Sequence, residues 1–440
     1  MKKIYASLLI AMPMLAFAEP ATEPAATETT STTITEVSSE SMTATTTESE
    51  SQEPLMTKEE KDHALKVKFM IANDEAAAAA AKNNTIVVQP VGRILMDAAA
   101  YATNDDEFKA GVAIPDVRAG VSAQYGKWKA KVDVGYAFGK VGLKDLFMEY
   151  DFTPNFLLRA GNFVHQFGLQ SATSSAMKVS MEEPTSNAVF NFPRLLGVMA
   201  QYDKGQFFGT FSLNVESNAL TMTANEMGKT GYGGMTRLVW RPMFQDGLVA
   251  QIGMSFALQS PTYNSNAALN HKSVSVSADF PTRVNNIQAI GATIDDAKSS
   301  FRFSPELLLC YQRIALESQY YYMRVDRHND LNAFVGYGTY AMLRGIAVGD
   351  NYKYSHADGG LATPDPKSLE LVLLYNYTNL SNKEAGIMGG RVNEVSLTAN
   401  WYINKWMIWR FRAGYTHRWN AAGLPDVDLG AFQTRLQIIF

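Results

Sequence analysis

Charged side chains alternate with aromatic ones near the C-terminal end of the chain. Arg410 and Arg412 alternate with Trp409 and Phe411, and Arg435 lies in a later run of the same kind. Because successive side chains of a β-strand point to opposite faces, this spacing places the arginines on one face and the rings on the other. A row of guanidinium groups on a wet face attracts anions, whereas a row of rings suits lipid. The chemistry indicated is the passage of solutes along a charged wall.

The residues that catalysis or metal binding requires are scattered. No H-x-x-x-H, H-E-x-x-H or G-x-S-x-G motif occurs, and the single cysteine, Cys310, excludes an intrachain disulfide. Asp350 and Asp358 lie in a segment that lacks the closing Glu of a calcium loop. We therefore expect no enzyme activity, no cofactor and no metal site. The six histidines lie far apart in the sequence: His63, His165, His271, His328, His356 and His417.

Residues 1–18 have the form of a secretory signal peptide. Lys2 and Lys3 precede a short apolar run, and Ala16-Phe17-Ala18 is an A-x-A cleavage signal. Residues 19–55 are rich in Thr, Ser, Glu, Pro and Ala, so we expect a disordered tail. Residues 56–84 contain a helix-favouring run of alanines and are expected to form a short helix that tethers, caps or plugs the remaining domain, 85–440.

From residue 85 onward, apolar residues recur at every second position, as in β-strands. In the last run Phe432, Leu436 and Phe440 share one face, and Arg435 lies on the other. We expect an all-β, antiparallel barrel of about sixteen strands. The expected spans are 87–101, 114–126, 128–138, 141–152, 155–164, 195–203, 205–217, 231–241, 247–258, 301–312, 313–326, 331–344, 368–380, 390–402, 405–416 and 429–440.

The connections between these spans differ in length. Those at 165–194, 218–230, 259–300 and 417–428 are longer and should lie at one end of the barrel. The connection 345–367 is also long but falls at the opposite end, where short turns are expected.

Alternation alone does not separate a membrane barrel, with its apolar face outward, from a soluble sandwich, with its apolar face inward. The signal peptide and the C-terminal aromatic residue favour a barrel in the bacterial outer membrane, surrounded by lipid, with the N-terminal tail in the periplasm. Aromatic residues typical of the membrane interface are Trp401, Tyr402, Trp406, Tyr415 and Trp419.

The charge of the expected barrel is almost balanced. The chain has 39 basic and 43 acidic residues; removing Lys2 and Lys3 and the eight Glu of 19–55 leaves 37 basic and 35 acidic residues. A net charge of +2 argues against nucleic acid as a partner and against a pore lined by one sign of charge.

Strand parity predicts which charged residues face the lumen. Two interpretations are open: basic and acidic sectors that create a field across the pore, or ion pairs that only hold the wall together. Arg93 and Asp97 resemble a local pair, whereas Arg410 and Arg412 need a partner or an anion and are the stronger selectivity candidates. The expected lumen residues are Arg93, Asp97, Asp145, Glu149, Arg159, Arg237, Arg241, Glu306, Arg313, Glu317, Glu370, Glu394, Arg410, Arg412 and Arg435.

Several segments, in order, resemble the phosphate-selective porin O and P family. The resemblance begins near residue 90 and runs to the end of the chain. The motifs that carry it are GRILMD at 92–97, VGLKDLFMEY at 141–150, LRAGNF at 158–163 with QFGL at 166–169, LELV at 369–372 and NEVSLTANWY at 393–402.

This resemblance implies a homotrimer of sixteen-stranded barrels, each with its third loop folded into the pore. Phosphate-selective members carry an arginine ladder and a lysine cluster. The third loop here, residues 165–194, has Lys178 as its only lysine, near Glu182 and Glu183. The expected function is passive diffusion of small hydrophilic solutes or ions, with phosphate among the candidate anions. The alternative is a structural or surface-interaction barrel with a closed lumen.

Overall fold

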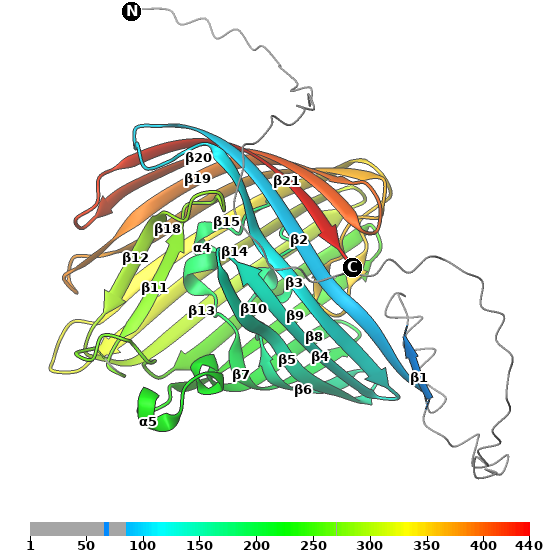
Figure 1. Ribbon diagram of the computed structural model, residues 1–440, viewed down its shortest axis with the longest axis horizontal. Helices are drawn as coiled ribbons and strands as arrows, with labels where there is room; N and C mark the ends of the chain where they lie inside the picture. The colour runs from blue at the N-terminus through cyan, green and yellow to red at the C-terminus, as the bar shows by residue number, and fades with distance from the viewer. Residues whose placement is uncertain (1–65, 70–84, 270) are drawn as a thin grey trace, which may run out of the picture. The chain divides into compact units, whose positions relative to one another are not determined.

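The computed structural model describes residues 66–69, 85–269 and 271–440, and the predicted signal peptide and tail lie outside them. Residues 85–440 form a closed antiparallel barrel of sixteen strands, as predicted (Figure 1). All sixteen expected spans correspond to strands, with ends that agree within five residues. The strands are β2 (Thr85–Thr103), β3 (Gly111–Tyr125), β4 (Trp128–Ala137), β5 (Lys140–Thr153), β6 (Phe156–Phe163), β7 (Leu195–Lys204), β8 (Phe207–Glu216), β9 (Tyr232–Gln245), β10 (Leu248–Gln259), β13 (Ala297–Tyr311), β14 (Ile314–Arg327), β15 (Phe334–Val348), β18 (Ser368–Asn382), β19 (Ile387–Tyr402), β20 (Met407–Ala421) and β21 (Val427–Ile439).

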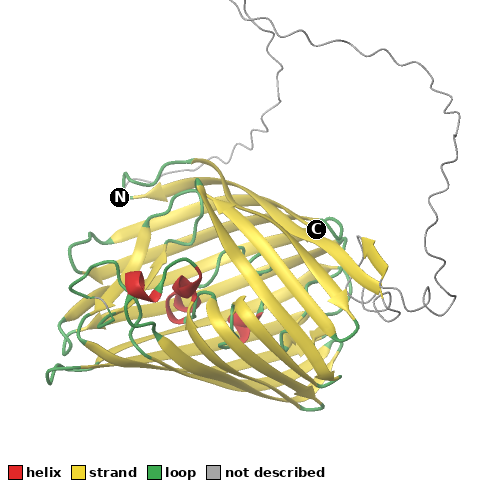
Figure 2. Cartoon of the chain, turned by 60° about the horizontal axis from the view of Figure 1, so that its bottom comes forward, coloured by secondary structure: helices red, strands yellow, loops and turns green. Residues whose placement is uncertain are grey.

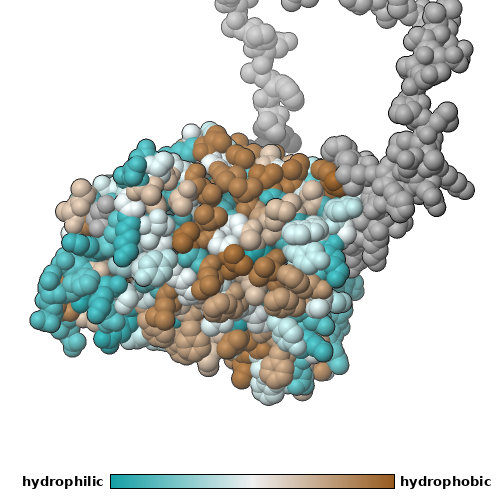
Figure 3. All heavy atoms as spheres, turned by 90° about the horizontal axis from the view of Figure 1, so that it is seen from below, coloured by the Kyte–Doolittle hydropathy of each residue, from teal (hydrophilic) through white to brown (hydrophobic). Residues whose placement is uncertain are grey.

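The two faces of the barrel wall divide the side chains as the alternation predicts. On β21, Phe432 is 68% exposed on the outer face, whereas Arg435 is 1% exposed on the inner face. Figure 3 shows apolar side chains gathered in a broad area of the outer surface. An apolar exterior around a polar interior is the arrangement of a barrel surrounded by lipid.

The first and last strands close the barrel. β2 pairs with β21 in a register that places Asp97 opposite Arg435. Beyond the end of β21, the amide of Gly92 donates to the carbonyl of Phe440 at 2.7 Å, and the amide of Phe440 donates to the carbonyl of Gly92 at 3.0 Å. The phenyl ring of Phe440 occupies the space beside Gly92 that a side chain would need.

We expect Gly92→Val to lower the yield of folded barrel. A Cβ atom at residue 92 would lie 2.5 Å from the Phe440 ring and 2.6 Å from the Arg118 carbonyl oxygen, and this backbone oxygen cannot move aside. The folded fraction is measured as the band whose gel mobility changes on heating. Gly142→Val is the matched control, because a Cβ atom there meets nothing within 4 Å. Equal folding of both variants would contradict the expectation.

The ends of the barrel differ. We call the end where β2 begins and β21 ends the terminal rim, and the opposite end the loop rim. The connections at the loop rim include 164–194, 217–231 and 260–296, whereas those at the terminal rim are short except for 349–367. The long terminal-rim turn, 349–367, contains the hairpin β16 (Tyr354–Ser355) and β17 (Gly360–Leu361).

Two loop-rim connections fold into the barrel. The third loop, 164–194, carries the short helices α3 (Leu169–Ala172) and α4 (Thr185–Phe190), and Figure 2 shows helices inside the ring of strands. The connection 260–296 forms the hairpin β11 (Val274–Asp279) and β12 (Gln288–Ile294), which the sequence did not indicate. Phe190 of α4, Ile290 of β12 and Val392 of the wall belong to one buried apolar cluster. This cluster therefore fills part of the lumen. The connection 217–231 carries η1 (Ser217–Leu220) and α5 (Ala224–Met227).

The helix expected over 56–84 is wrong for the four of its residues that are described. Lys66–Phe69 forms strand β1, which pairs in parallel with β2, Lys66 opposite Thr85. The start of β2, before its ladder with β21 begins at Arg93, pairs with this segment, so strand pairing outweighs its intrinsic helix propensity. The other residues of the expected helix lie outside the described part of the chain.

Candidate functional site

Arginines from β20 and β21 hold the third loop against one side of the wall. Arg435 donates to the carbonyl oxygen of Met181 at 2.9 Å and pairs with Glu182 at 2.5 Å. Arg410 donates to the carbonyl oxygens of Ala176, at 3.0 Å, and Lys178. Because these guanidinium groups are buried behind the loop, they anchor its backbone.

Arg412 and Arg410 lie on the same face and repel each other, and Arg412 has an acidic partner that offsets this repulsion. Its guanidinium donates to Glu394 at 2.8 Å and to the carbonyl oxygen of Pro281, in the connection 260–296, at 3.1 Å. The same Glu394 accepts a hydrogen bond from the hydroxyl of Thr185 in α4 at 3.0 Å. One buried ion pair thus fixes both inward-folded connections to the wall.

The expected pairing of Arg93 with Asp97 is wrong. Asp97 pairs with Arg435 of the neighbouring strand at 2.6 Å, and Arg93 pairs with Asp116 of β3, its Nε donating at 3.0 Å. Residues four apart on a strand are separated by about 13 Å, whereas residues across a ladder lie about 5 Å apart. Arg313 is also misplaced, because it lies exposed in the turn between β13 and β14.

The three charged residues predicted for the third loop have different surroundings. Lys178 donates to the carbonyl oxygen of Gln170 and lies 3.8 Å from Glu183, and its burial lowers the pKa of the ammonium group. Glu182 lies between Arg435 and Arg283, 3.2 Å from Arg283. Lys178 and Glu183 line the open part of the lumen, and Glu182 is buried behind the loop.

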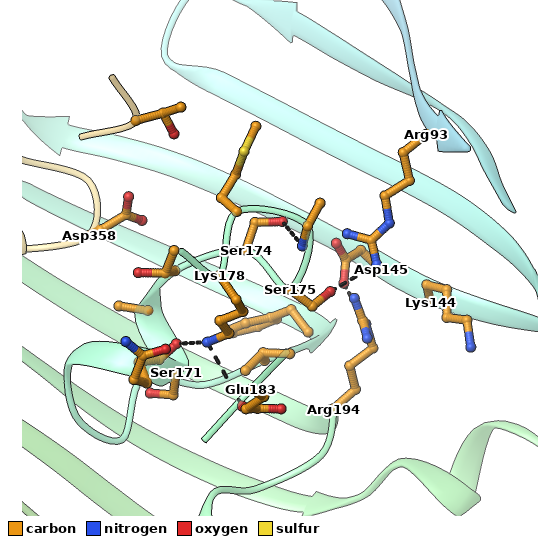
Figure 4. Close-up of a pocket in the computed structure, with 18 of the residues that line it drawn as sticks. Arg93, Lys144, Asp145, Ser171, Ser174, Ser175, Lys178, Glu183, Arg194 and Asp358 are labelled. Atoms are coloured by element: carbon orange, nitrogen blue, oxygen red, sulfur yellow. Dashed lines mark hydrogen bonds and ion pairs between the residues drawn. The ribbon is translucent and has the colours of Figure 1, made fainter. Parts of the chain in front are cut away.

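The open part of the lumen is a cavity of about 730 Å³ between the third loop and the wall formed by β2–β6 (Figure 4). Of the predicted lumen arginines, Arg93 and Arg159 line this cavity; Arg237, Arg241, Arg410, Arg412 and Arg435 do not. The basic side chains on this wall and at the adjoining end of the third loop are Arg93, Arg118, Lys131, Lys144, Arg159 and Arg194. Across the cavity lie the carboxylates of Glu183, Glu317 and Asp358, together with the basic side chains of Lys178 and Arg344.

A β-bulge on β5 turns Lys144 into this cavity. Val132 pairs with Leu146 and Val134 with Leu143, so both Lys144 and Asp145 lie opposite Asp133. The carboxylate of Asp133 accepts a hydrogen bond from the Asp145 amide at 2.5 Å, which stabilises the bulge. Bulges of this kind re-aim side chains, and here the result is two consecutive residues on the lumen face.

The two side chains of the bulge are used differently. Asp145 pairs with Arg194 at 2.7 Å and with Lys131 at 2.9 Å. The stem of Lys144 lies over Gly135, where a Cβ atom would be 3.0 Å from its Cγ atom. Within the described residues the Lys144 ammonium group has no hydrogen-bond or ion-pair partner. Arg118, Arg194 and Arg93 repel its positive charge and Asp116 attracts it, so most of its charged neighbours are cations.

Comparisons with known proteins give a family. Residues 101–440 match the family described as phosphate-selective porin O and P. The chain belongs to this family. It is therefore a porin of the bacterial outer membrane, and its fold indicates a channel.

The solved structures similar to this porin share little sequence with it. The anion-selective porin from Comamonas acidovorans is 11% identical with a TM-score of 0.50, and the match covers 81% of this chain and 100% of that one. OprB from Pseudomonas putida is 9% identical with a TM-score of 0.49, over 80% of this chain and 94% of that one. DcaP from Acinetobacter baumannii is 11% identical with a TM-score of 0.47, over 81% and 97%. No curated protein sequence matches the porin.

The described part of the porin contains neither a metal-binding cluster nor a membrane-spanning helix. Its His, Cys, Asp and Glu side chains form no group of three or more that could hold a metal ion. Its helices are all too short or too polar to cross a membrane.

Sequence reasoning missed five basic residues of the cavity: Arg118, Lys131, Lys144, Arg194 and Arg344. A signal for Lys144 exists, because Lys144 and Asp145 interrupt the alternation between Leu143 and Leu146. Two adjacent polar residues between apolar ones indicate a bulge in a strand of otherwise regular period.

Proposed function

We propose that this porin prefers anions and that they pass along the wall formed by β2–β6. The observation that supports this route is the ammonium group of Lys144, which has no partner among the described residues and is held by the bulge beside Arg118 and Arg194. An anion that approaches it replaces part of its own hydration by attraction to several cations at once. We call this cluster of Arg118, Lys144 and Arg194 the cationic wall.

The opposite side of the cavity supplies the other half of a transverse field. Glu183 of the third loop and Asp358 of the turn 349–367 form an acidic edge facing the cationic wall. Asp116, Asp133 and Asp145 lie between the basic residues of the wall and weaken their attraction for a multiply charged anion. We therefore propose a moderate anion preference without tight retention of phosphate.

Planar-bilayer recordings test this proposal. In a KCl gradient of about tenfold across the bilayer, we expect a reversal potential of the sign given by chloride permeation. Phosphate added to chloride solution should reduce the chloride current only slightly. A cation-preferring or unselective channel would contradict the proposal.

A channel without measurable conductance would favour the alternative, a barrel with a closed lumen. The feature that supports this alternative is how much of the lumen the third loop, the connection 260–296 and the turn 349–367 fill. We propose in either case that the chain has no enzyme activity. Hydrolase assays on the purified protein test that part.

We also propose a homotrimer, with the N-terminal tail in the periplasm after removal of the signal peptide. Ala98 and Ala100 on the outer face of β2 line a shallow apolar hollow of about 590 Å³ with Ala413, where another barrel can approach closely. Ala100→Trp should therefore convert trimers to monomers on gels run without heating. Protease protection of the tail in intact cells, and its loss on opening the outer membrane, tests the sidedness.

The anion preference should increase on acidification. Burial raises the pKa of Asp358 above its ordinary value, although Arg237, Lys178 and Arg159 oppose this effect. Asp358 should therefore take up its proton at a higher pH than a free aspartate, and the acidic edge then loses a negative charge. Reversal potentials recorded from about pH 7 to pH 4 should show this step. Asp358→Asn should lack it, and a step of equal size in that variant would contradict the assignment.

A further inference from the structure

Two segments enter the lumen from opposite ends of the barrel and meet at one side chain. The third loop comes from the loop rim and the turn 349–367 from the terminal rim. Gly360 of the turn lies against Leu169 of α3, since a Cβ atom there would be 3.0 Å from a Leu169 methyl group. Arg237, on the inner face of β9, reaches both segments.

The guanidinium group of Arg237 uses all five of its N–H donors. Nη1 donates to Gln166 of the third loop at 3.1 Å and to the carbonyl oxygen of Asp358 at 2.6 Å. Nη2 donates to the carbonyl oxygen of Gly359 at 2.9 Å and to Glu306 at 2.8 Å. Nε donates to the other oxygen of Glu306 at 3.1 Å. Lysine has three donors and cannot reproduce this pattern.

The surroundings of Arg237 leave little freedom to this arrangement. The side chain is fully buried, and its guanidinium carbon lies 5.3 Å from the centre of the Phe208 ring. Gly359 has a φ of +56°, and a Cβ atom there would lie 2.9 Å from the same ring. Gln251 donates a second hydrogen bond to the Gly359 carbonyl oxygen at 2.8 Å. The tip of the turn is thus held by its backbone, and the Asp358 carboxylate projects toward the cavity.

We infer that Arg237 is a positioning residue that sets the ion preference of the pore by fixing Asp358 at the acidic edge. Arg237 does not line the cavity, so its own charge is shielded from the solute and balanced by Glu306. Its effect on permeation runs through the backbone carbonyls of the turn. The inference rests on the proposed function, because it requires that the acidic edge oppose anion passage.

Four variants in planar bilayers test the inference: Asp358→Asn, Arg237→Lys, the double variant, and Arg324→Lys as the control. Arg324 pairs with Asp326 on the exposed outer face, so the control should match the wild type. Asp358→Asn should raise the chloride-to-potassium permeability ratio about two- to threefold. Arg237→Lys should shift it in the same direction and add open-channel noise, because the tip of the turn is released.

The double variant distinguishes positioning from direct charge. If Arg237 acts through Asp358, the permeability ratio of the double variant should equal that of Asp358→Asn alone. An unchanged ratio in Arg237→Lys, with a shift in Asp358→Asn, would overturn the role of Arg237. No shift in Asp358→Asn would instead overturn the acidic edge of the proposed function.

A second variant keeps the test decisive if Arg237→Lys does not reach the folded barrel. Gln251→Leu removes the other hydrogen bond to the Gly359 carbonyl oxygen, together with the hydrogen bonds of Gln251 to Glu306 and Tyr354, and retains the Arg237 side chain. It should shift the permeability ratio in the same direction as Asp358→Asn, by a smaller factor. A wild-type ratio in Gln251→Leu would count against positioning of the turn tip.

Discussion

Replacing Lys144 with Glu should abolish or reverse the anion preference of the porin. Lys144 is the cation of the wall that has no protein partner among the described residues, so its charge acts on a passing ion most directly. A change of two unit charges about 5 Å from the ion path is worth about 1–2 kcal/mol in water. The chloride-to-potassium permeability ratio should therefore fall roughly tenfold at low salt and less at high salt.

Reversal potentials in KCl at two ionic strengths measure this effect. Lys405→Glu is the matched control, because Lys405 lies exposed in the turn between β19 and β20, over the Trp406 ring. Lys144→Gln should give an intermediate ratio. If Lys144→Glu and Lys405→Glu shift the ratio equally, the cationic wall is not the selective element.

The β-bulge on β5 should also affect the permeability ratio, because it directs Lys144 into the cavity. Asp133→Asn keeps a side chain of similar shape but weakens the hydrogen bond from the Asp145 amide. If Lys144 loses its fixed direction, the ratio should move toward the value of Lys144→Gln even though a negative charge has been removed from the wall. A simple charge effect would move the ratio the other way, so the sign of the change separates the two explanations.

Of the substitutions proposed for this porin, Arg435→Met should lower the stability of the folded barrel the most. Arg435 pairs with both Asp97 and Glu182, and all three side chains are buried. Removing one partner of a buried ion pair costs about 3–5 kcal/mol, because the remaining charges stay desolvated. The third loop also loses the hydrogen bond to the Met181 carbonyl oxygen.

The expected result is a barrel that loses its heat-modifiable band at lower temperature and conducts more, because the third loop leaves its place. Arg324→Met is the control, because its ion pair with Asp326 is exposed on the outer face and screened by solvent. Wild-type thermal stability in Arg435→Met would show that the two carboxylates find other partners.

The strands of this porin could be predicted from its sequence because lipid imposes a strict rule on the outer face. Outward residues such as Phe432 and Leu397 must be apolar, and inward residues such as Arg435 are free to be polar, so the period of two survives along the whole barrel. The inward-folded segments obey no such rule. The hairpin β11–β12 contains apolar residues, but in the sequence its segment resembles an ordinary long loop.

The candidate site was predicted less well, since the role of a lumen residue depends on what covers it. Parity places Arg410 in the lumen and, with Asp145 inward, Lys144 on the lipid face. In the structure the third loop covers Arg410, and the bulge turns Lys144 into the open cavity. The predicted partner of Arg93 was also wrong. Partners are set by the register between strands, which a single sequence does not reveal. The bulge at Lys144 was not predicted, although the sequence contains its signal, a break in the alternation between Leu143 and Leu146.

The anchoring of the third loop has a consequence for how readily this pore can be redesigned. Arg410, Arg435 and Gln437 bind the loop at the main-chain oxygens of residues such as Ala176 and Met181. Every amino acid offers that oxygen, so replacing the side chains of the loop leaves this part of its attachment intact. The face of the loop toward the cavity can therefore vary, by natural drift or by engineering, while the same arginines keep its path through the barrel.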